Sequence, residues 1–399
     1  MTSDGPLPLE GTLILDLSRM LPGAVLARQL IDLGARLIKV EEPGDGDPMR
    51  MVPPHVDGIG VGFAAFYRGA ESITLDLRDD EGAQCLRRLA ASADVLVESF
   101  RPGTLAGWGL GFKELSAENP RLVWCSLSSF GSAPEVRDRV AHDLNLSAMA
   151  GILDLVGGRV PRLQLADITS GILASSAILA ALFVRERTGC GTRLEQPLSA
   201  GPLPFLTWGW AELAAGGGGV LDTLLGGACP CYRIYRCGDG KSLSLAALEP
   251  KFWAGFVELI GADELAASAF ALGADGERAA AAVERALADH PREHWLRLAE
   301  DHGLPVGPVH GLTRRPRTPR SRPQAWSKRR RCRTAHHFLG SVPSCLPWAE
   351  PPPSPHRGLA NTQPASWRNL EFHVSFEFLV LSFELRTRTP LFGRAGTQN

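Results

Sequence analysis

The feature that most constrains the fold of this chain is an alternation of short apolar runs and helical repeats over roughly its first third. The apolar runs that predict buried strands lie at residues 13–17, 37–41, 73–77, 94–98 and 122–127. Between them, Leu26, Leu30 and Leu33 repeat with helical spacing, and residues 80–91 do the same. Strands separated by helices need crossover connections, so the pattern predicts an α/β fold with a mostly parallel sheet.

The loop after the first predicted strand lacks the glycines of a dinucleotide site. Residues 18–23 contain only Gly23, whereas a G-x-G-x-x-G turn uses three glycines around the pyrophosphate. The sheet therefore has the architecture of a nucleotide-binding fold, but NAD and FAD are poor candidates as cofactors.

A second domain is predicted after a run of four glycines at residues 216–219. An almost uncharged stretch at 167–185 precedes it and is apolar on most sides, which is typical of a core helix. The elements expected beyond the glycines are strands at 231–236 and 242–248 and helices near 251–260 and 276–290. We therefore expect a large domain at residues 1–215 and a smaller α+β domain at 216–312.

The tail, residues 313–399, follows a different compositional rule. Residues 1–312 carry 27 Lys and Arg against 39 Asp and Glu, whereas the tail carries 15 against 4. Ten of these cations lie between Arg314 and Arg333 with no acid among them, a composition that cannot bury a core. Two explanations are open: an arm that binds a polyanion such as nucleic acid, or a shifted reading frame in a GC-rich gene. We favour the second, since the run has no regular aromatic interleaving.

Composition argues against a membrane protein and against a metal site. The longest charge-poor run, 168–184, is shorter than the ~20 apolar residues that a bilayer needs. No basic region followed by an apolar stretch opens the chain, so no signal peptide is expected. The eight cysteines include no C-x-x-C pair. We expect a cytoplasmic protein with reduced thiols and no bound metal.

Several segments resemble the class III CoA-transferase family. They are LEGTLILDLS at 9–18, GARLIKVE at 34–41, GDPMR at 46–50, RTGCG at 187–191 and YRIYR at 232–236, in the family's order. The resemblance extends from about residue 9 to Val309. It implies a Rossmann-like large domain, a smaller domain, an interlocked homodimer and acyl-CoA thioesters as substrates. CoA would be part of the substrate, and no separate cofactor is implied.

The resemblance leaves two chemistries open, which share one aspartate. Asp167 matches the residue that is a nucleophile in the transferases and an acid or base in the α-methylacyl-CoA racemase branch. His142 matches a racemase histidine at a position where the transferases generally lack one. The resemblance therefore favours a racemase of 2-methyl-branched acyl-CoA, with a CoA transferase as the first alternative. A non-enzymatic polyanion-binding protein that uses the basic tail is the second.

Two unlike bases suit the inversion of a carbon next to a thioester. That carbon is a weak acid, so a base must remove its proton on one face while an acid returns one on the other. Histidine titrates near neutrality, and burial raises the pKa of a carboxyl group. We expect His142 and Asp167 to flank this carbon. By resemblance, Glu249 orients or charges His142.

Each of these residues also has an ordinary structural explanation. Aspartate is a favoured N-cap, so Asp167 could simply begin a helix. An isolated His142 is more often an exposed or satisfied side chain, and Glu249 followed by proline looks like a helix start. The arrangement favours catalysis: Ala-His-Asp, a mostly uncharged stretch, then Ala-Asp opening an apolar helix.

The resemblance also marks residues for contact with CoA. They are Leu75, Asp76, Leu77, Arg78, Ala141, Asp143, Leu144, Asn145 and Leu146. Arg101 is a further candidate for a phosphate contact, although Arg78 and Arg101 could also be ordinary surface cations. Two departures matter. Ala70 and Glu71 stand where relatives often have lysine and arginine, and Glu42 stands where racemases commonly place an arginine. Losing cations beside a polyanion removes attraction and adds repulsion.

Overall fold

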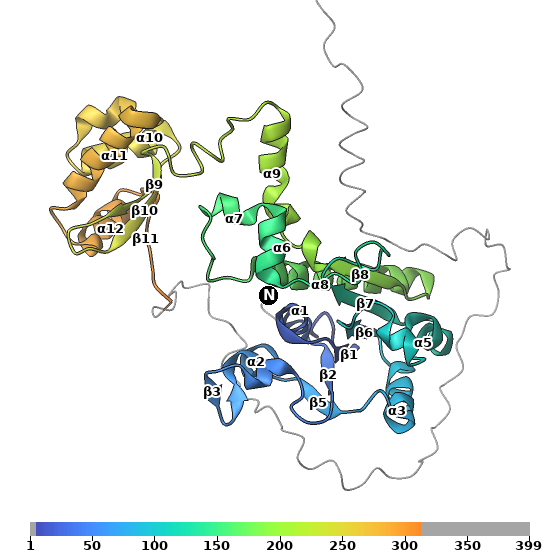
Figure 1. Ribbon diagram of the computed structural model, residues 1–399. Helices are drawn as coiled ribbons and strands as arrows, with labels where there is room; N and C mark the ends of the chain where they lie inside the picture. Colours follow the sequence, from blue (N-terminus) through green and yellow to red (C-terminus); the bar gives the residue numbers. More distant parts are fainter. Residues whose placement is uncertain (1–4, 313–399) are drawn as a thin grey trace, which may run out of the picture. The chain divides into compact units, whose positions relative to one another are not determined.

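The computed structural model describes residues 5–312 (Figure 1). These residues form two compact units that divide between Phe205 and Leu206, whereas the boundary predicted from the glycine run is at 215–216. The predictions for the tail, both the polyanion-binding arm and the shifted frame, lie outside the described residues. Each unit is described by itself below.

The first unit is built on a six-stranded parallel sheet. In spatial order its strands are β5 (Glu71–Thr74), β2 (Arg36–Glu41), β1 (Leu13–Leu17), β6 (Val95–Glu98), β7 (Val123–Ser128) and β8 (Arg193–Pro197). The chain builds outward from β1 to one edge, then returns to pair β6 with the other side of β1. This is the doubly wound Rossmann order, whose direction reverses between β1 and β6. The predicted α/β class with a large parallel sheet is confirmed.

The strands differ from the prediction mainly at the sheet edges. β5 ends at Thr74, so Leu75 and Leu77 follow the strand instead of belonging to it. β8 was not predicted, because Arg-Leu-Glu-Gln-Pro is neither an apolar run nor a clear alternation. The short hairpin of β3 (His55–Val56) and β4 (Ile59–Gly60) was also missed.

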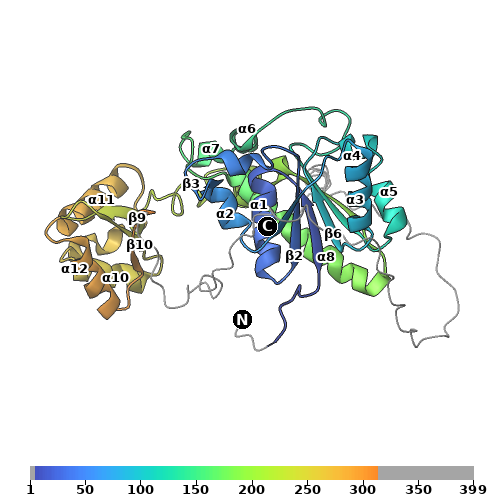
Figure 2. The ribbon, with the colours of Figure 1, turned by 90° about the horizontal axis from the view of Figure 1, so that it is seen from below.

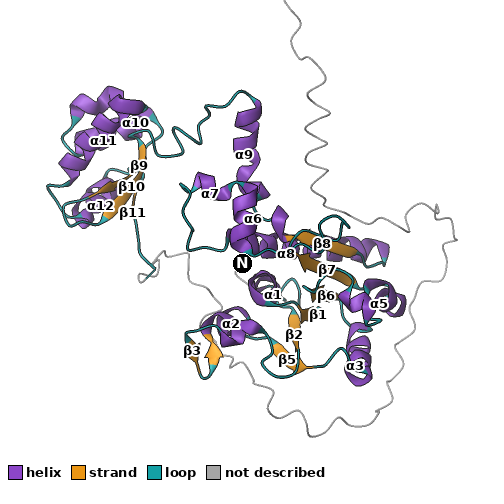
Figure 3. Cartoon of the chain, in the orientation of Figure 1, coloured by secondary structure: helices purple, strands orange, loops and turns teal. Residues whose placement is uncertain are grey.

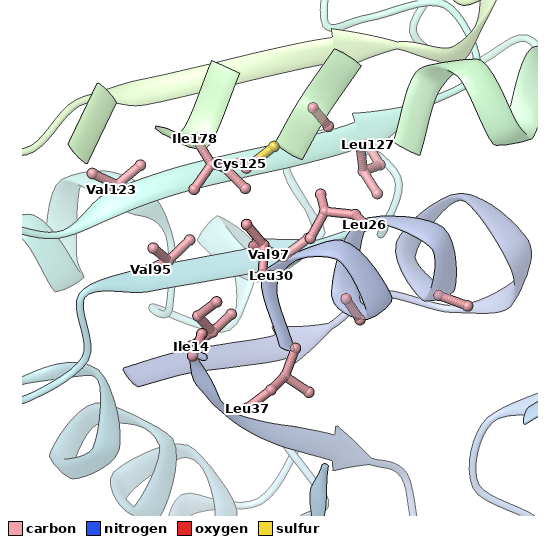
Figure 4. Packing of buried hydrophobic residues seen from close by; sticks show 14 of the residues in the cluster. Ile14, Leu26, Leu30, Leu37, Val95, Val97, Val123, Cys125, Leu127 and Ile178 are labelled. Atoms are coloured by element: carbon pink, nitrogen blue, oxygen red, sulfur yellow. The ribbon is translucent and has the colours of Figure 1, made fainter. Parts of the chain in front are cut away.

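Helices cover both faces of this sheet (Figure 2). On one face, α1 (Met20–Asp32) and α8 (Leu165–Thr188) pack over β1, β6 and β7, with Leu26, Leu30 and Ile178 fully buried (Figure 4). On the other, Leu86 of α3 (Asp80–Ala90) and Leu115 of α5 (Phe112–Glu118) pack on the opposite strand residues. The remaining helical elements are η1 (Pro48–Met51), α2 (Val61–Phe66), α4 (Thr104–Gly107), α6 (Asp143–Ala150), α7 (Ile152–Leu155), η2 (Leu198–Ala200) and α9 (Leu203–Ala214), which crosses into the second unit.

α8 extends the predicted core helix at both ends. It begins at Leu165 with Gln164 as N-cap, so Asp167 lies in the first turn and is not the cap. Gly189 ends it in the left-handed conformation that glycine adopts without strain. Among residues 5–312, α8 is also the helix with the length and hydropathy to cross a membrane, and 44% of its apolar window is buried in this unit.

The second unit is a small α+β unit (Figure 3). β9 (Tyr232–Arg236), β10 (Ser242–Ala246) and β11 (Val306–Pro308) form an antiparallel sheet with β10 in the middle. Its helical elements are α10 (Pro250–Leu259), η3 (Asp263–Ser268), α11 (Gly273–Leu287) and α12 (Arg292–Asp301). Trp253, Phe256 and Val283 lie in its core with Leu243 of β10. The predicted strand pair and two of its helices are present, while α12 and β11 were not predicted.

Candidate active site

A pocket of about 140 Å³ lies at the carboxyl edge of the parallel sheet. Its walls come from the ends of β1 and β2, from the segment after β5, and from Phe100 after β6. The lining residues are Leu17, Ser18, Arg19, Lys39, Val40, Glu41, Glu42, Gly46, Asp47, Leu75, Asp76, Leu77, Arg78, Phe100 and Trp108. Doubly wound folds bind their ligands at this edge, next to the point where the strand order reverses.

The segment 75–78, predicted to contact CoA, lies in this pocket. Leu77 is buried, while Arg78 is exposed and forms two parallel hydrogen bonds to Asp76, with Nε–Oδ1 2.7 Å and Nη2–Oδ2 2.9 Å. Arg101 is exposed at the turn that leads into α4, outside the residues that line the pocket.

A buried charge network supports the pocket from behind. Lys39 is 1% exposed and its Nζ lies 3.6 Å from Asp16 Oδ2 and 3.3 Å from Asp47 Oδ2. It also donates to the Ser18 carbonyl oxygen, and the Tyr67 hydroxyl donates to Asp16. We did not predict this network, although a lysine in the middle of the apolar run 37–41 was a visible signal, since buried lysines need partners.

Glu41, the last residue of β2, is a second buried charged residue behind the pocket. Arg50 Nη2 lies 2.6 Å from its Oε1, and the Ser72 hydroxyl and the Asp47 amide also donate to it. Burial alone would raise the pKa of Glu41, but these hydrogen bonds and the Arg50 charge together lower it. Arg50 belongs to the GDPMR segment, whose role is thus to hold the end of β2.

The predicted catalytic pair lies where α6 and α8 begin. His142 is the exposed N-cap of α6, and its backbone N–H donates to Asn145 Oδ1 at 3.3 Å. Asp143, the first residue of α6, accepts a hydrogen bond from the Asp167 amide at 3.1 Å. This bond ties the first turn of α8 to the start of α6, which brings His142 and Asp167 into one neighbourhood.

The surroundings of Asp167 oppose its ionisation. Burial is the largest cause, the charge of Asp143 is the second, and the charge of His142 acts in the opposite direction. Together they raise the pKa of Asp167 to about 6. A carboxyl group with a pKa near neutrality can both hold and release a proton under physiological conditions, which is the property required of an acid–base catalyst.

Asp167 and the pocket lie at the same edge of the sheet. One turn after Asp167, Gly171 packs so closely against α1 that an added Cβ would lie 2.5 Å from the Pro22 carbonyl oxygen. Pro22 is in the first turn of α1, which follows the end of β1. Asp167 is therefore one turn from the contact between α8 and α1, which follows the pocket wall at residues 17–19, although neither His142 nor Asp167 lines the pocket itself.

The other residues of the segment 141–146 differ in exposure. The Ala141 carbonyl oxygen accepts a hydrogen bond from the Ser129 hydroxyl at 3.3 Å. Leu144 and Asn145 are exposed, and Asn145 Oδ1 accepts the His142 amide hydrogen bond that caps α6. Leu146 is 1% exposed, so its side chain belongs to the interior and only its backbone faces His142. This burial argues against a CoA contact by the Leu146 side chain.

Glu249 belongs to the second unit. It is the exposed N-cap of α10, followed by Pro250 at the first helical position, as the helix-start explanation expects. Its association with His142 stays a prediction.

A buried carboxyl group that we did not predict ends β6. Glu98 is 8% exposed, and burial raises its pKa to about 7 against the opposing hydrogen bonds from Ser126 and the Phe100 amide. The signal in the sequence was an acid closing an otherwise apolar strand at the reversal point of the sheet. Among residues 5–312, no group of three or more His, Cys, Asp or Glu side chains is arranged to hold a metal ion.

Known proteins are similar to this chain in sequence. A profile of CoA-transferase family III matches residues 9–346. An acetyl-CoA:oxalate CoA-transferase of Acetobacter aceti is 33% identical over 316 residues, covering 76% of this chain and 80% of the relative. An α-methylacyl-CoA racemase of Homo sapiens is 33% identical over 267 residues, covering 64% of this chain and 66% of the relative.

The fold agrees as well. The crystal structure of a CAIB/BAIF family protein from Brucella suis aligns with a TM-score of 0.67 at 32% identity, covering 77% of this chain and 85% of that one. The sheet order, the family profile and these relatives lead to one conclusion: the chain belongs to CoA-transferase family III.

Proposed function

We propose that the chain is an acyl-CoA racemase that inverts the α-carbon of 2-methyl-branched acyl-CoA thioesters by proton transfer between two bases. The observation that carries the proposal is Asp167, whose pKa is raised to about 6 and which lies close enough to His142 to feel its charge, at the carboxyl edge of the sheet. Relatives with racemase activity support it, and so does the histidine at position 142.

In the proposed reaction, one group removes the α-proton and the other returns a proton on the opposite face. The C–H electron pair passes into an enolate, so no electrons leave the substrate and no cofactor besides its own CoA is required. Asp143 positions the catalytic carboxyl group through the Asp167 amide. Each of the two groups is expected to contribute roughly 10²–10⁴ to the rate.

We place the nucleotide end of CoA in the pocket at the ends of β1, β2 and β6, with Arg19 and Arg78 as the cations nearest its phosphates. The segment 141–146 would then lie beside the thioester, with Arg101 as a further phosphate contact and Glu249 as the residue that orients His142. A doubly wound sheet binds ligands at this edge, which supports the placement.

Exchange of the substrate α-proton with deuterium tests the catalytic assignment. In D₂O, the wild-type protein with a 2-methylacyl-CoA is expected to incorporate deuterium without any acceptor acid. His142→Ala and Asp167→Asn are expected to lower the rate by about 10²–10⁴. His55→Ala and Asp154→Asn change exposed residues of the same types elsewhere in the first unit and serve as controls. Undiminished exchange in either site variant rejects the assignment.

A CoA transferase with Asp167 as nucleophile is the second candidate, because the most similar relatives include transferases. Here the carboxylate would attack the thioester carbonyl, forming a mixed anhydride and releasing the CoA thiolate. Hydroxylamine would convert that anhydride into a hydroxamate at Asp167. A trapped hydroxamate, together with no deuterium incorporation in the absence of an acceptor, would favour the transferase.

We also propose a homodimer in the cytoplasm. Exposed apolar side chains on the first unit support a partner surface, among them Phe183 (59% exposed) and Val184 (50%) of α8 and Met149 (60%) of α6. Analytical ultracentrifugation of the full chain is expected to give twice the monomer mass. The double variant Phe183→Glu and Val184→Glu is expected to shift it towards the monomer. A monomeric wild-type protein at micromolar concentration contradicts the proposal.

A further inference from the structure

Glu98 is a buried carboxyl group that the proposed reaction does not use. It is the last residue of β6, at the carboxyl edge of the sheet between β1 and β7, and is 8% exposed. In the sheet it pairs with Leu17, which lines the pocket, on one side and with Ser126 on the other. Carboxyl groups are rarely buried to this extent, because burial disfavours their charged form.

Glu98 holds one wall of the pocket in place. The Phe100 amide donates a hydrogen bond of 2.8 Å to Glu98 Oε2. Phe100 lines the pocket together with Trp108, and the centroids of the two rings are 5.6 Å apart. The residue between Glu98 and Phe100 is Ser99, whose hydroxyl oxygen accepts a 2.8 Å hydrogen bond from the Arg19 amide. This turn therefore positions both the aromatic wall and the backbone of a cation that we place near the phosphates of CoA.

The groups around the Glu98 carboxyl are mostly uncharged. β7 contributes the Ser126 hydroxyl and the Trp124 indole, whose hydrogen bonds favour the ionised form, and the buried Cys125 thiol. β8 contributes Arg193, an exposed cation whose charge also favours ionisation. Burial outweighs these groups and the Phe100 amide, and it raises the pKa of Glu98 to about 7. The carboxyl group is therefore divided between its neutral and ionised forms near neutral pH.

An ionised carboxyl group at this place opposes the binding of an anion. The phosphates of CoA carry several negative charges, and charges interact more strongly beside a low-dielectric interior than in water. Occupation of the pocket therefore favours neutral Glu98. Neutral Glu98 favours occupation to the same degree, because the coupling between two bound species is reciprocal. The neutral group keeps a carbonyl oxygen for the Phe100 amide, so the wall is held in both forms.

We infer that Glu98 is a positioning residue of the pocket and that its carboxylate takes up a proton from solvent when CoA binds. The carboxylate oxygen gains the proton, a carboxylic acid forms, and no electrons are transferred. The inference rests on the proposed function and adds a regulation of the same site. Through this group, CoA binds more tightly as the pH falls from 8 to 6.

Isothermal titration of the full-length protein with CoA measures this coupling. Titrations at pH 7.5 in buffers of different ionisation enthalpy give the number of protons taken up per CoA. If binding raises the proton affinity of Glu98 about tenfold, the wild-type protein takes up about half a proton more than Glu98→Gln. Its Kd is expected to rise about three- to fivefold more than that of the variant between pH 6 and pH 8. Protons exchanged by CoA, His142 and Asp167 are common to both proteins, so the difference isolates Glu98.

Two substitutions separate the two roles of Glu98. Glu98→Gln keeps an oxygen for the Phe100 amide and carries no charge. At pH 8 it is expected to bind CoA about three- to fivefold more tightly than wild type. Glu98→Ala leaves the Phe100 amide without this acceptor and is expected to bind CoA more weakly than Glu98→Gln at every pH. Glu118→Gln changes an exposed carboxylate at the end of α5, away from the pocket lining, and is expected to match wild type.

The outcomes separate this inference from the proposed function. Equal proton uptake and parallel pH profiles for wild type and Glu98→Gln overturn the proton coupling. Equal affinities for Glu98→Ala and Glu98→Gln overturn the positioning role. In both cases CoA still binds, so the acyl-CoA function stands. If the wild-type protein binds no CoA between pH 6 and pH 8, the proposed function falls together with the inference.

Discussion

The position of Asp167 could be predicted from the sequence, whereas the tertiary contacts that surround its carboxyl group could not. Its place in the sequence, before an apolar helix and after Ala-His-Asp, was enough to predict a reactive carboxyl group. Its pKa is raised mainly by burial and then by the charge of Asp143, which lies 24 positions earlier and meets it because α6 and α8 begin side by side. Contacts of this kind have no local sequence signal, so the contribution of Asp143 to the pKa of Asp167 could not be predicted, whereas the effect of burial was expected.

The raised pKa of Asp167 has a consequence for stability. An unfolded chain releases this proton near pH 4 and the folded chain near pH 6, so the folded state loses stability as pH rises through this window. Asp167→Asn removes the free-energy cost of ionising this carboxyl group in the folded state. We expect the variant to exceed wild type in unfolding free energy at pH 8 by on the order of 1–2 kcal/mol, allowing for the solvent access of a half-buried group.

Urea unfolding at pH 4.5 and pH 8 checks this prediction. The difference between the two proteins is expected to be much smaller at pH 4.5, near the start of this window, than at pH 8. Equal unfolding free energies for Asp167→Asn and wild type at pH 8 would contradict an unfavourable ionisation of Asp167 in the folded state.

Asp143 offers a separate test of the acid–base assignment. Asp143→Asn keeps an oxygen for the Asp167 amide but removes the charge that helps to raise the pKa of Asp167. The acid limb of the pH–rate profile for deuterium exchange is expected to move to lower pH by about half a unit. Asp154→Asn, on an exposed part of α7, is expected to leave the profile in place. If the acid limb of the Asp143→Asn profile does not move, the charge of Asp143 has no part in the pH dependence of exchange.

At the scale of elements, the contact between α1 and α8 fixes where the first turn of α8, with Asp167, lies. Gly171 approaches the backbone of α1, and a Cβ there would lie 2.5 Å from the Pro22 oxygen and 2.8 Å from Val25 Cβ. Gly171→Ala is therefore expected to destabilise the protein by about 1–2 kcal/mol, since overpacking outweighs the gain in helix propensity. Deuterium exchange is expected to slow as well, because Asp167 is one turn away.

Gly107→Ala is the matched control for this substitution. Gly107 is the last residue of α4, and a Cβ there would meet nothing within 4 Å. Its unfolding midpoint in urea is expected to stay within experimental error of wild type or to rise. Equal midpoints for Gly171→Ala and wild type would show that α1 moves to accept the methyl group.

The central strands were predictable because burial on both faces leaves a nearly continuous apolar run, as in 13–17 and 122–127, each with a single polar residue. β8 was not, since an edge strand with half-buried positions accepts Arg, Glu and Gln. The same reasoning applies to β11, three residues long, which only its pairing with β10 defines. Local pattern therefore predicts the middle of a sheet better than its margins.

At the scale of the whole molecule, each unit has a core of its own. The core of the second unit contains Trp253, Phe256 and Val283, all buried, together with the two aromatic–carbonyl hydrogen bonds of Trp253 and Trp295. The fragment 206–312 is expected to fold alone and to unfold cooperatively in urea, with a slope of about 1–1.5 kcal/mol per molar.

Circular dichroism of this fragment supplies the measurement. Trp253→Ala is expected to lower its unfolding free energy by about 3–5 kcal/mol, enough to abolish the transition in a small unit. A broad, non-cooperative wild-type transition would mean that the fragment needs the first unit to fold.

The strand order could not be deduced from alternation alone, because the same six strands permit several doubly wound arrangements. Resemblance to the family supplied the Rossmann-like expectation, and pairing of β1 with both β2 and β6 confirmed it. The order also decides which loops meet: the ends of β1, β2 and β6 share one edge. For this reason Glu42 and Arg19, far apart in the chain, form one rim.

The buried lysine behind that rim has a thermodynamic consequence. Lys39 is held by Asp16, Asp47 and the Ser18 carbonyl oxygen, so displacing its ammonium group would leave two interior carboxylates without their counter-charge. This edge of the sheet is thus preorganised: an incoming ligand meets walls that are already ordered. Association there should lose little conformational entropy, in the manner of lock-and-key recognition.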